Sequence, residues 1–176
     1  IKSDSILDEE AKHRATSLYF PDAKIPMFPA SFSEDVASLW EGKTRLAVSF
    51  LVEVSRDGVI FSRRIVPSII RVARKLSYDF VDNLLENGGA DSHENRMLAA
   101  MLGDAWLVAS SLEKVRLARG AIFISRREVF PVVDDNGHIR LEEWQDDTPA
   151  RKLVSELMVL ANETGALYAM DKGIPL

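Results

Sequence analysis

The sequence has no cysteine among its 176 residues, which excludes disulfide bonds and metal sites built on thiolates. Histidine is scarce as well, and its three positions lack the regular spacing of zinc ligands: His13, His93 and His138. No apolar run approaches the ~18 residues that a membrane-spanning helix needs, and no secretory signal pattern opens the sequence. These absences favour a cytoplasmic protein without a membrane partner.

Acidic residues are missing from two segments of a chain that is acidic overall. The sequence holds 27 acidic and 22 basic residues, so its formal net charge is −5, which argues weakly against nucleic-acid binding. Residues 62–78 and 114–127 nevertheless contain basic residues and no acid. The basic residues are Arg63, Arg64, Arg71, Arg74, Lys75, Lys114, Arg116, Arg119, Arg126 and Arg127. Each segment is either a solvated face or a surface that contacts phosphates.

Two hairpins are predicted, because turn residues separate runs of apolar and β-branched residues. The turns are Ser55–Gly58 and Asp134–Gly137, in which glycine can take the positive φ that a tight turn requires. Proline lacks an N–H donor, so Pro21 is expected to end one strand and Pro67 to interrupt another. The predicted strands are residues 17–20, 45–54, 59–66, 121–124, 128–133 and 138–144, and residues 68–75 are expected to continue as extended chain or a further strand.

Helices are predicted where apolar residues recur at helical spacing behind a capping residue. The expected caps are Ser33, Ser77, Ser92 and Thr148, the last followed by Pro149 at the first helical position. The predicted helices are residues 8–14, 34–39, 78–87, 93–119 and 149–171. Together these elements predict an α+β fold, with antiparallel β-hairpins packed against long α-helices.

Hydrolysis of a phosphodiester by metal ions needs several carboxylates around each cation. The chain has two adjacent aspartate pairs, Asp134–Asp135 and Asp146–Asp147, but the first fits a hairpin turn and the second a helix entry. No glycine-rich phosphate loop, Ser-His-Asp arrangement or metalloprotease motif is present. The residues alone therefore predict no metal site within the chain and no complete catalytic set.

Groups able to hold single-stranded RNA are present. Such strands are bound by aromatic rings that stack on bases and by cations that follow the phosphates. Tyr19 lies in a proline-rich segment, whereas Tyr78 and Phe123 lie in the two acid-free segments. Aromatic residues of strands pack in a core more often than they bind a ligand, so both roles stay open for these rings.

A resemblance to a known family narrows these alternatives. Residues 16–39, TSLYFPDAKIPMFPASFSEDVASL, resemble without a gap a segment of the ribonuclease II/R family catalytic (RNB) domain. That segment has the pattern T-S-V-Y-L-P-D-x-x-I-P-M-L-P-x-x-L-S-x-D-L-C-S-L. Further similar segments follow in the family's order: EGKTRLAVSFLVEVSRDGVI, RKLSYDFVDNLLE, RLARGAIFI and RKLVSELMVLANETGALY. The resemblance covers nearly the whole chain.

The resemblance implies a 3′-to-5′ exoribonuclease that degrades single-stranded RNA processively to nucleoside monophosphates with Mg²⁺. Tyr19 resembles the family's aromatic that stacks on nucleotides near the 3′ end, and Phe123 resembles its second stacking ring. Tyr78 resembles a tyrosine close to the scissile phosphate and is the candidate catalytic residue. Glu156 resembles a glutamate that contacts the terminal ribose, whose 2′-OH distinguishes RNA from DNA. The alternative for Glu156 is a solvated helix position.

Parts of the family's active site have no counterpart in the chain. The family's metal-binding aspartates, in a D-x-D-D motif, precede the position that matches Ile1, and an arginine and a glutamate follow the position that matches Leu176. We therefore expect residues 1–176 to be a single unit of a larger, monomeric exoribonuclease, inactive alone and able to self-associate through exposed apolar edges. The alternatives are a catalytically inactive relative that binds RNA, and an interaction domain that shares only the fold.

Overall fold

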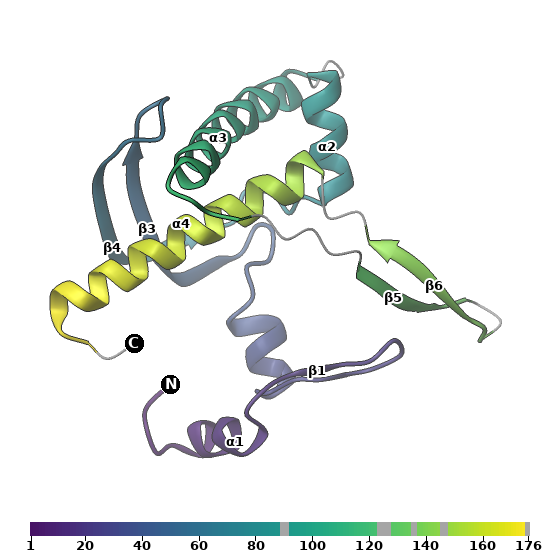
Figure 1. Ribbon diagram of the computed structural model, residues 1–176. Helices are drawn as coiled ribbons and strands as arrows, with labels where there is room; N and C mark the ends of the chain where they lie inside the picture. The colour runs from purple at the N-terminus through teal and green to yellow at the C-terminus, as the bar shows by residue number, and fades with distance from the viewer. Residues whose placement is uncertain (89–91, 123–127, 135–136, 145–147, 175–176) are drawn as a thin grey trace. The chain divides into compact units, whose positions relative to one another are not determined.

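The computed structural model describes residues 1–88, 92–122, 128–134, 137–144 and 148–174. Its elements are, in order (Figure 1), α1 Ile6–Arg14, β1 Leu18–Tyr19, β2 Lys24–Ile25, η1 Ser31–Val36, β3 Thr44–Val54, β4 Ile60–Arg71, α2 Tyr78–Asn87, α3 His93–Ala118, β5 Glu128–Val133, β6 Ile139–Trp144 and α4 Pro149–Lys172. The strands form three two-stranded sheets, β1–β2, β3–β4 and β5–β6. The predicted α+β class, with antiparallel hairpins and long helices, is confirmed.

The chain divides into two compact units, each assembled from segments that are distant in the sequence. The first unit comprises Ile1–Leu46, Ile69–Lys75 and Arg127–Trp144. The second unit comprises Ala47–Ser68, Leu76–Arg126 and Gln145–Leu176. That residues 1–176 act as a single unit of a larger domain stays a prediction.

In the first unit, helix α1 follows Ser5, whose side-chain oxygen accepts a hydrogen bond from the Asp8 N–H at 3.4 Å. The last turn of α1 carries Lys12, His13 and Arg14, while acidic residues lie in its first turn. This order stabilises the helix, because its N-terminal end has partial positive charge and its C-terminal end partial negative charge.

The first hairpin pairs β1 with β2, and Tyr19 lies opposite Lys24. The Phe20 N–H donates to the Ala23 carbonyl at 2.8 Å, which closes the turn around the next two residues. Regular pairing therefore stops before Pro21, as the sequence predicted.

The short helix η1 begins earlier than predicted and without a side-chain cap. Its first turn is held by the Pro29 carbonyl, which accepts the N–H groups of Phe32 and Ser33 at 2.9 and 3.0 Å. Ser33 thus lies inside the helix, and its hydroxyl donates to the Pro29 carbonyl at 3.3 Å. The prediction that Ser33 caps a helix was wrong, because a proline with preset φ already begins the turn four residues earlier.

The hairpin β5–β6, also in the first unit, follows the sequence prediction. Its register places Glu128 opposite Trp144 and Val133 opposite Ile139. Asp134 forms the turn, since its Oδ1 accepts the His138 N–H at 2.9 Å. This role as a turn residue is the one that the sequence favoured.

In the second unit, Gly58 lies in the turn of the β3–β4 hairpin and packs closely on α3. Its φ is +79°, and its N–H donates to the Ser55 carbonyl at 3.0 Å. A Cβ atom at this position would lie 2.9 Å from the Ser111 carbonyl oxygen and 3.0 Å from Val115 Cγ2. Both the turn geometry and the lack of space therefore require glycine.

Strand β4 runs through Pro67 without a break, so the predicted interruption was wrong. Within the described chain, β4 pairs only with β3. A proline is compatible with such an edge strand, because the position of its missing N–H can face away from the partner. Across the hairpin, the hydroxyl oxygens of Ser49 and Ser68 lie 2.7 Å apart.

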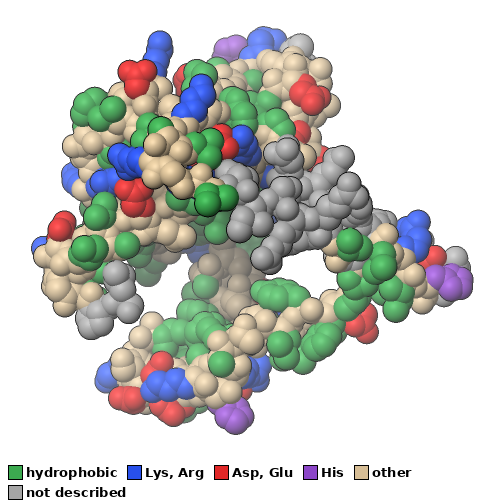
Figure 2. Space-filling view, viewed as in Figure 1, with side chains coloured by type: hydrophobic (Ala, Val, Ile, Leu, Met, Phe, Trp, Pro, Cys, Tyr) green, Lys and Arg blue, Asp and Glu red, His purple; other side chains and the backbone are tan. Residues whose placement is uncertain are grey.

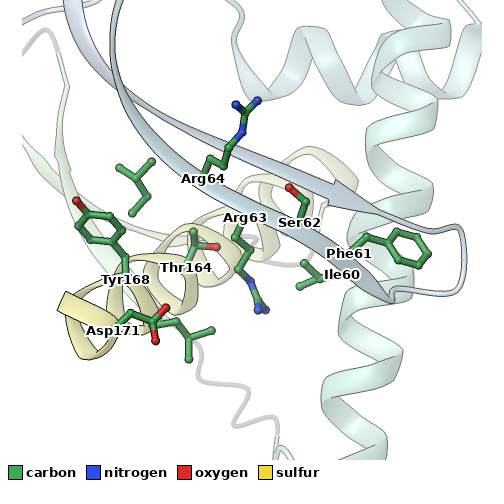
Figure 3. Close-up of a pocket in the computed structure, with 10 residues that line it drawn as sticks. Ile60, Phe61, Ser62, Arg63, Arg64, Thr164, Tyr168 and Asp171 are labelled. Atoms are coloured by element: carbon green, nitrogen blue, oxygen red, sulfur yellow. The ribbon is translucent and has the colours of Figure 1, made fainter. Parts of the chain in front are cut away.

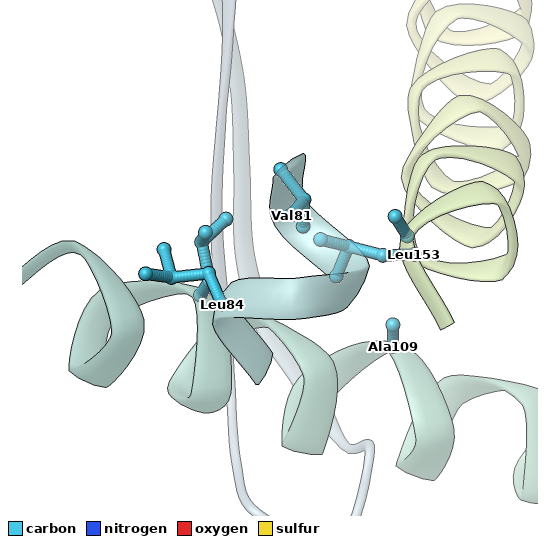
Figure 4. Packing of buried hydrophobic residues seen from close by; sticks show 6 residues of the cluster. Val81, Leu84, Ala109 and Leu153 are labelled. Atoms are coloured by element: carbon cyan, nitrogen blue, oxygen red, sulfur yellow. The ribbon is translucent and has the colours of Figure 1, made fainter. Parts of the chain in front are cut away.

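Helices α2, α3 and α4 surround an apolar cluster in the second unit (Figure 4). Its buried members are Val81, Leu84, Leu102, Ala109, Ala150 and Leu153. Asp82 of α2 connects to the first turn of α4, where its Oδ1 accepts the Ala150 N–H at 2.8 Å. This bond satisfies one of the N–H groups that the start of a helix leaves without an intrahelical partner.

The predicted caps of these three helices are confirmed. The side chains of Ser77, Ser92 and Thr148 each accept a hydrogen bond from the backbone N–H three residues further along. Gly88 and Gly173 end α2 and α4 in the left-handed conformation, which glycine adopts without a steric penalty.

The chain after α3 differs from the predicted strand over residues 121–124. Gly120 takes a φ of +95°, and the Ala121 N–H then donates to the Arg116 carbonyl at 3.2 Å. Ala121 therefore completes the end of the helix, and neither Ala121 nor Ile122 is part of a strand. The rest of that predicted strand lies outside the described residues.

Large apolar side chains are exposed in both units, and apolar and charged groups share the surface in Figure 2. The most exposed are Ile6, Tyr19, Leu46, Ile69, Ile122 and Leu141. Among the described helices, none has the length and hydrophobicity that crossing a membrane requires.

Candidate nucleic-acid interface

Glu156 is buried within α4, where it is 3% exposed. Its carboxylate oxygen Oε1 accepts a hydrogen bond from Nη2 of Arg116 on α3. A buried carboxylate without a partner is strongly unfavourable, so this ion pair is what permits the charge at that position. The alternative of a solvated helix position is therefore wrong for Glu156.

A second arginine–glutamate pair lies about two turns further along α4. Nη2 of Arg63, on β4, donates to Oε1 of Glu163 at 2.8 Å. Residues seven positions apart lie on the same face of a helix, so Glu156 and Glu163 project to one side. Helix α4 thus presents two carboxylates, and each is paired with an arginine from a different element.

The two ion pairs line a hollow of about 330 Å³ that is formed by the β3–β4 turn, α3 and α4. Its charged lining residues are Arg63, Arg116, Arg119, Glu156 and Glu163. Three arginines against two glutamates leave a positive excess, and an excess of this sign attracts phosphate groups. In the described part of the chain, the side chain of Arg119 forms no hydrogen bond or ion pair.

Tyr78 is the first residue of α2 and lines a different, mainly apolar hollow of about 490 Å³. The residue is 40% exposed. The guanidinium carbon of Arg151, in the first turn of α4, lies 4.5 Å from the ring centroid. A cation over an aromatic face is attractive, so Arg151 holds the ring of Tyr78 at the wall of this hollow.

A third hollow, of about 280 Å³, lies between β4 and α4 (Figure 3). Arg63 and Arg64 line it from the strand, and Tyr168 and Asp171 line it from the helix. Thr164 also contributes, and its buried hydroxyl oxygen has no hydrogen-bond partner in the described chain. None of these residues was predicted as a site residue individually.

Tyr19 belongs to the first unit, whereas Tyr78 and Glu156 belong to the second and line separate hollows. Tyr19 is 75% exposed, and Nζ of Lys24 lies 5.8 Å from the centroid of its ring. An exposed ring beside a cation has the properties that base stacking requires. Phe123 lies outside the described residues.

Carboxylates close enough to share a metal ion occur, among the described residues, at Asp4, Asp8 and Glu9. The ammonium group of Lys12 already lies 3.2, 3.0 and 2.9 Å from their oxygens. Hydrogen bonds from the Asp4 N–H and from Lys12 lower the pKa of Asp8. The hydrogen bonds that Lys12 donates to Glu9, Asp8 and Asp4 raise the pKa of Lys12. An ammonium group that contacts all three carboxylates already lies where a shared cation would be held, so this cluster does not fit Mg²⁺.

The two adjacent aspartate pairs of the sequence, Asp134–Asp135 and Asp146–Asp147, provide no further described metal site. Asp134 is used by its hairpin turn. The other three aspartates lie outside the described residues: Asp135, Asp146 and Asp147.

Sequence reasoning missed the partners of the predicted site residues. Arg116 was noticed only as a member of an acid-free segment, and Arg151 was not noticed at all. One signal was available, because Glu156 follows the core residue Leu153 by three positions and so shares its side of α4. A charged residue at core spacing indicates a buried ion pair, although it does not identify the partner.

Residues 1–176 match the family model of the RNB domain. Ribonuclease R of Thermotoga maritima is 35% identical over 99% of this chain and 25% of its own length. Ribonuclease R 2 of Lactococcus lactis is also 35% identical, over 97% of this chain and 26% of its own length. The chain thus spans about a quarter of the length of the curated relatives that it matches.

Solved structures of Mycoplasma genitalium RNase R share the fold. The complex with ribose methylated single-stranded RNA has a TM-score of 0.89 at 28% identity, and it covers 100% of this chain and 27% of that one. The complex with double-stranded RNA has a TM-score of 0.90 at 28% identity, and it covers 100% and 31%. The chain therefore belongs to the RNB domain family, as the sequence resemblance indicated.

Proposed function

We propose that this chain is a segment of the catalytic domain of a 3′-to-5′ exoribonuclease, which hydrolyses single-stranded RNA processively to nucleoside monophosphates. The observation that carries the proposal is the family match, which extends over residues 1–176 and includes relatives named ribonuclease R. The larger enzyme is proposed to be a cytoplasmic monomer, of which residues 1–176 form a single unit.

The proposed RNA contacts use four side chains in distinct roles. Tyr19 and Phe123 stack on bases near the 3′ end, and the exposure of the Tyr19 ring supports this role. Tyr78 lies close to the scissile phosphate, where its hydroxyl can donate a hydrogen bond to a phosphate oxygen. Glu156 accepts a hydrogen bond from the terminal ribose, and its ionised partner Arg116 keeps the carboxylate in place for that contact.

The proposed reaction also requires divalent cations, for which we propose Mg²⁺. Bound near the scissile phosphate, such ions stabilise developing negative charge and activate water. The described carboxylate cluster does not fit this role, because Lys12 already lies at the point that its carboxylates share. We therefore propose that the metal ligands lie outside the described residues.

The proposal is tested by incubating the full-length protein with a 5′-labelled single-stranded RNA, with Mg²⁺ and with a chelator. We expect Mg²⁺-dependent shortening to a short limit product, and the Tyr19→Ala variant should change the length of that product. Binding without shortening would instead identify an inactive RNA-binding relative. Absence of both binding and shortening would leave an interaction domain that shares only the fold.

A further inference from the structure

We propose that the hollow of about 280 Å³ between β4 and α4 is a second ligand site, which binds a nucleoside monophosphate. All of its lining residues belong to the second unit. Neither the family resemblance nor the proposed RNA contacts assign a role to this hollow. The inference goes beyond the proposed function, because it concerns a free mononucleotide in a hollow other than the one that Glu156 lines.

The first step concerns a buried hydroxyl group on α4. Thr164 is 2% exposed, and its Oγ1 forms no hydrogen bond within the described chain. A threonine inside a helix can direct its hydroxyl to the carbonyl four residues earlier, but Thr164 does not. A buried polar group without a partner is unfavourable, and valine has nearly the same shape without the hydroxyl. The hydroxyl therefore indicates a partner that is not part of the described chain.

The second step concerns a donor on the facing strand. Arg63 extends from β4 toward α4 (Figure 3), where its Nη2 donates to Glu163 at 2.8 Å. Its Nε is buried and has no hydrogen-bond partner among the described residues. The side chain of Arg63 is 28% exposed, so its guanidinium group has room to turn toward a ligand. Arginine N–H groups only donate, and phosphate oxygens are their preferred acceptors together with carboxylates.

The third step concerns the groups further along α4. Thr164, Tyr168 and Asp171 follow one another at spacings of four and three residues, so they share one side of the helix. At a rise of 1.5 Å per residue, Asp171 lies about 10 Å from Thr164 along the helix axis. Tyr168 lies between them and is 42% exposed. An exposed aromatic ring can stack on a base, and a carboxylate accepts hydrogen bonds.

These groups define the chemistry of the ligand. Arg63 and Thr164 require an anionic group with several acceptor oxygens. Tyr168 requires a planar body, and Asp171 requires a hydrogen-bond donor at the far end. A nucleoside monophosphate combines a phosphate, a planar base and the amino or hydroxyl donors of base and ribose. Inorganic phosphate would satisfy only the first requirement, and a hollow of about 280 Å³ is of the size that a small ligand needs.

The test measures binding of labelled cytidine 5′-monophosphate (CMP) to the full-length protein by equilibrium dialysis, with a chelator and saturating single-stranded RNA present. The chelator prevents metal-dependent hydrolysis, and the RNA occupies the proposed RNA contacts, so CMP that still binds reports another site. Inorganic phosphate is added as a competitor in a parallel series. Thermal unfolding is followed for each variant.

Three variants separate the hydroxyl from other effects. Thr164→Val removes the hydroxyl and nearly preserves the shape, whereas Thr164→Ser retains the hydroxyl. The control is Arg56→Gln, which removes an exposed positive charge from the turn of the same β-hairpin, outside the hollow.

We expect CMP to bind in the presence of RNA and Thr164→Val to weaken that binding about tenfold, the effect of one hydrogen bond to a charged group. Thr164→Val should not lower the melting temperature, because the hydroxyl has no partner in the described chain. Thr164→Ser should retain CMP binding. Arg56→Gln should change it only slightly, since salt screens an exposed charge.

Three results would overturn the inference. Loss of all CMP binding on addition of RNA would assign CMP to the RNA contacts. Equal affinities of the wild type and Thr164→Val would remove the hydroxyl from the site, above all if that variant also melted at a lower temperature. Inorganic phosphate that competes as tightly as CMP itself would overturn the nucleotide assignment.

The failure of the inference can be told apart from failure of the proposed function. The dialysis measurement requires no hydrolysis, so CMP binding that depends on Thr164 would support the site even in a protein that shortens no RNA. Conversely, a protein that shortens RNA in Mg²⁺ but binds no CMP beside the RNA would retain the proposed function and lose this site.

Discussion

Ion pairs occur in two very different settings in this protein, on the surface of α1 and inside the α3–α4 helix pair. In α1, Lys12 is surrounded by Asp4, Asp8 and Glu9 at 3.2 Å or less. In the second unit, Arg116 pairs with the buried carboxylate of Glu156. The same chemical groups meet in both places, but water screens the first set and is largely excluded from the second.

This difference shows which charges are informative about function. Exposed pairs on a helix are common and contribute little to stability, so their presence needs no further explanation. A buried carboxylate is unfavourable unless it is paired, and an apolar residue of similar size would be at least as stable. Stability alone therefore does not explain a glutamate at position 156, and this supports the binding role proposed for it.

The largest effect is expected from breaking the buried pair. Arg116→Ala leaves the Glu156 carboxylate buried without its cation, which should lower the free energy of unfolding by about 3 kcal/mol. Urea unfolding of the protein measures this change. Lys12→Ala is the matched exposed variant, and its effect should be too small to detect. Equal effects of the two variants would remove the distinction between the two settings.

The next effect comes from the close contact between the β3–β4 turn and α3. Gly58→Ala adds a Cβ atom 2.9 Å from the Ser111 carbonyl oxygen at a φ of +79°, and should lower stability by about 2–3 kcal/mol. Gly42 has a similar φ of +73° with nothing within 4 Å, so Gly42→Ala should lower stability by only about 1 kcal/mol. Similar losses in both variants would show that the turn does not press on α3.

A smaller effect separates a real helix cap from a false one. Ser77→Ala removes the hydroxyl that accepts the Phe80 N–H at 3.3 Å, and this should lower stability by about 1 kcal/mol. Ser33→Ala should change stability by much less, because Ser33 caps no helix end. A larger loss for Ser33→Ala than for Ser77→Ala would contradict the structure of η1.

The smallest effect is the titration of α1. The Asp4 N–H and Lys12 hold the pKa of Asp8 below its ordinary value of 3.8. A carboxyl whose pKa is lower in the folded state stabilises the fold above the unfolded-state pKa, and this contribution is lost as pH falls through the folded-state pKa. The Lys12→Met variant should therefore raise the pKa of Asp8, as an NMR titration of its carboxyl carbon would show. An unshifted pKa would mean that Lys12 does not contact Asp8 in solution.

Much of the fold could be predicted from the sequence, because capping residues and turn glycines act locally. Ser77, Ser92 and Thr148 begin their helices as predicted, and Gly58 forms its turn. Local rules failed at Pro67, which an edge strand tolerates.

The site could be predicted only in part. The family resemblance identified Tyr19, Tyr78 and Glu156 as candidate site residues. The arginines that contact Tyr78 and Glu156, which are Arg151 and Arg116, come from elements distant in the sequence. Such partners are set by how helices pack, and no spacing rule within one helix specifies them. The pairing of Arg116 with a residue 40 positions away therefore had to come from the structure.

A double-mutant cycle tests most directly whether Arg116 acts through Glu156. The rate constant for removing the terminal ribonucleotide is measured for the full-length wild type, Arg116→Lys, Glu156→Gln and the double variant, in Mg²⁺. If Arg116 acts by positioning the carboxylate, the double variant should be no slower than Glu156→Gln alone, because the group being positioned is already changed. Two losses that simply multiply would show that the residues act independently and would contradict this account.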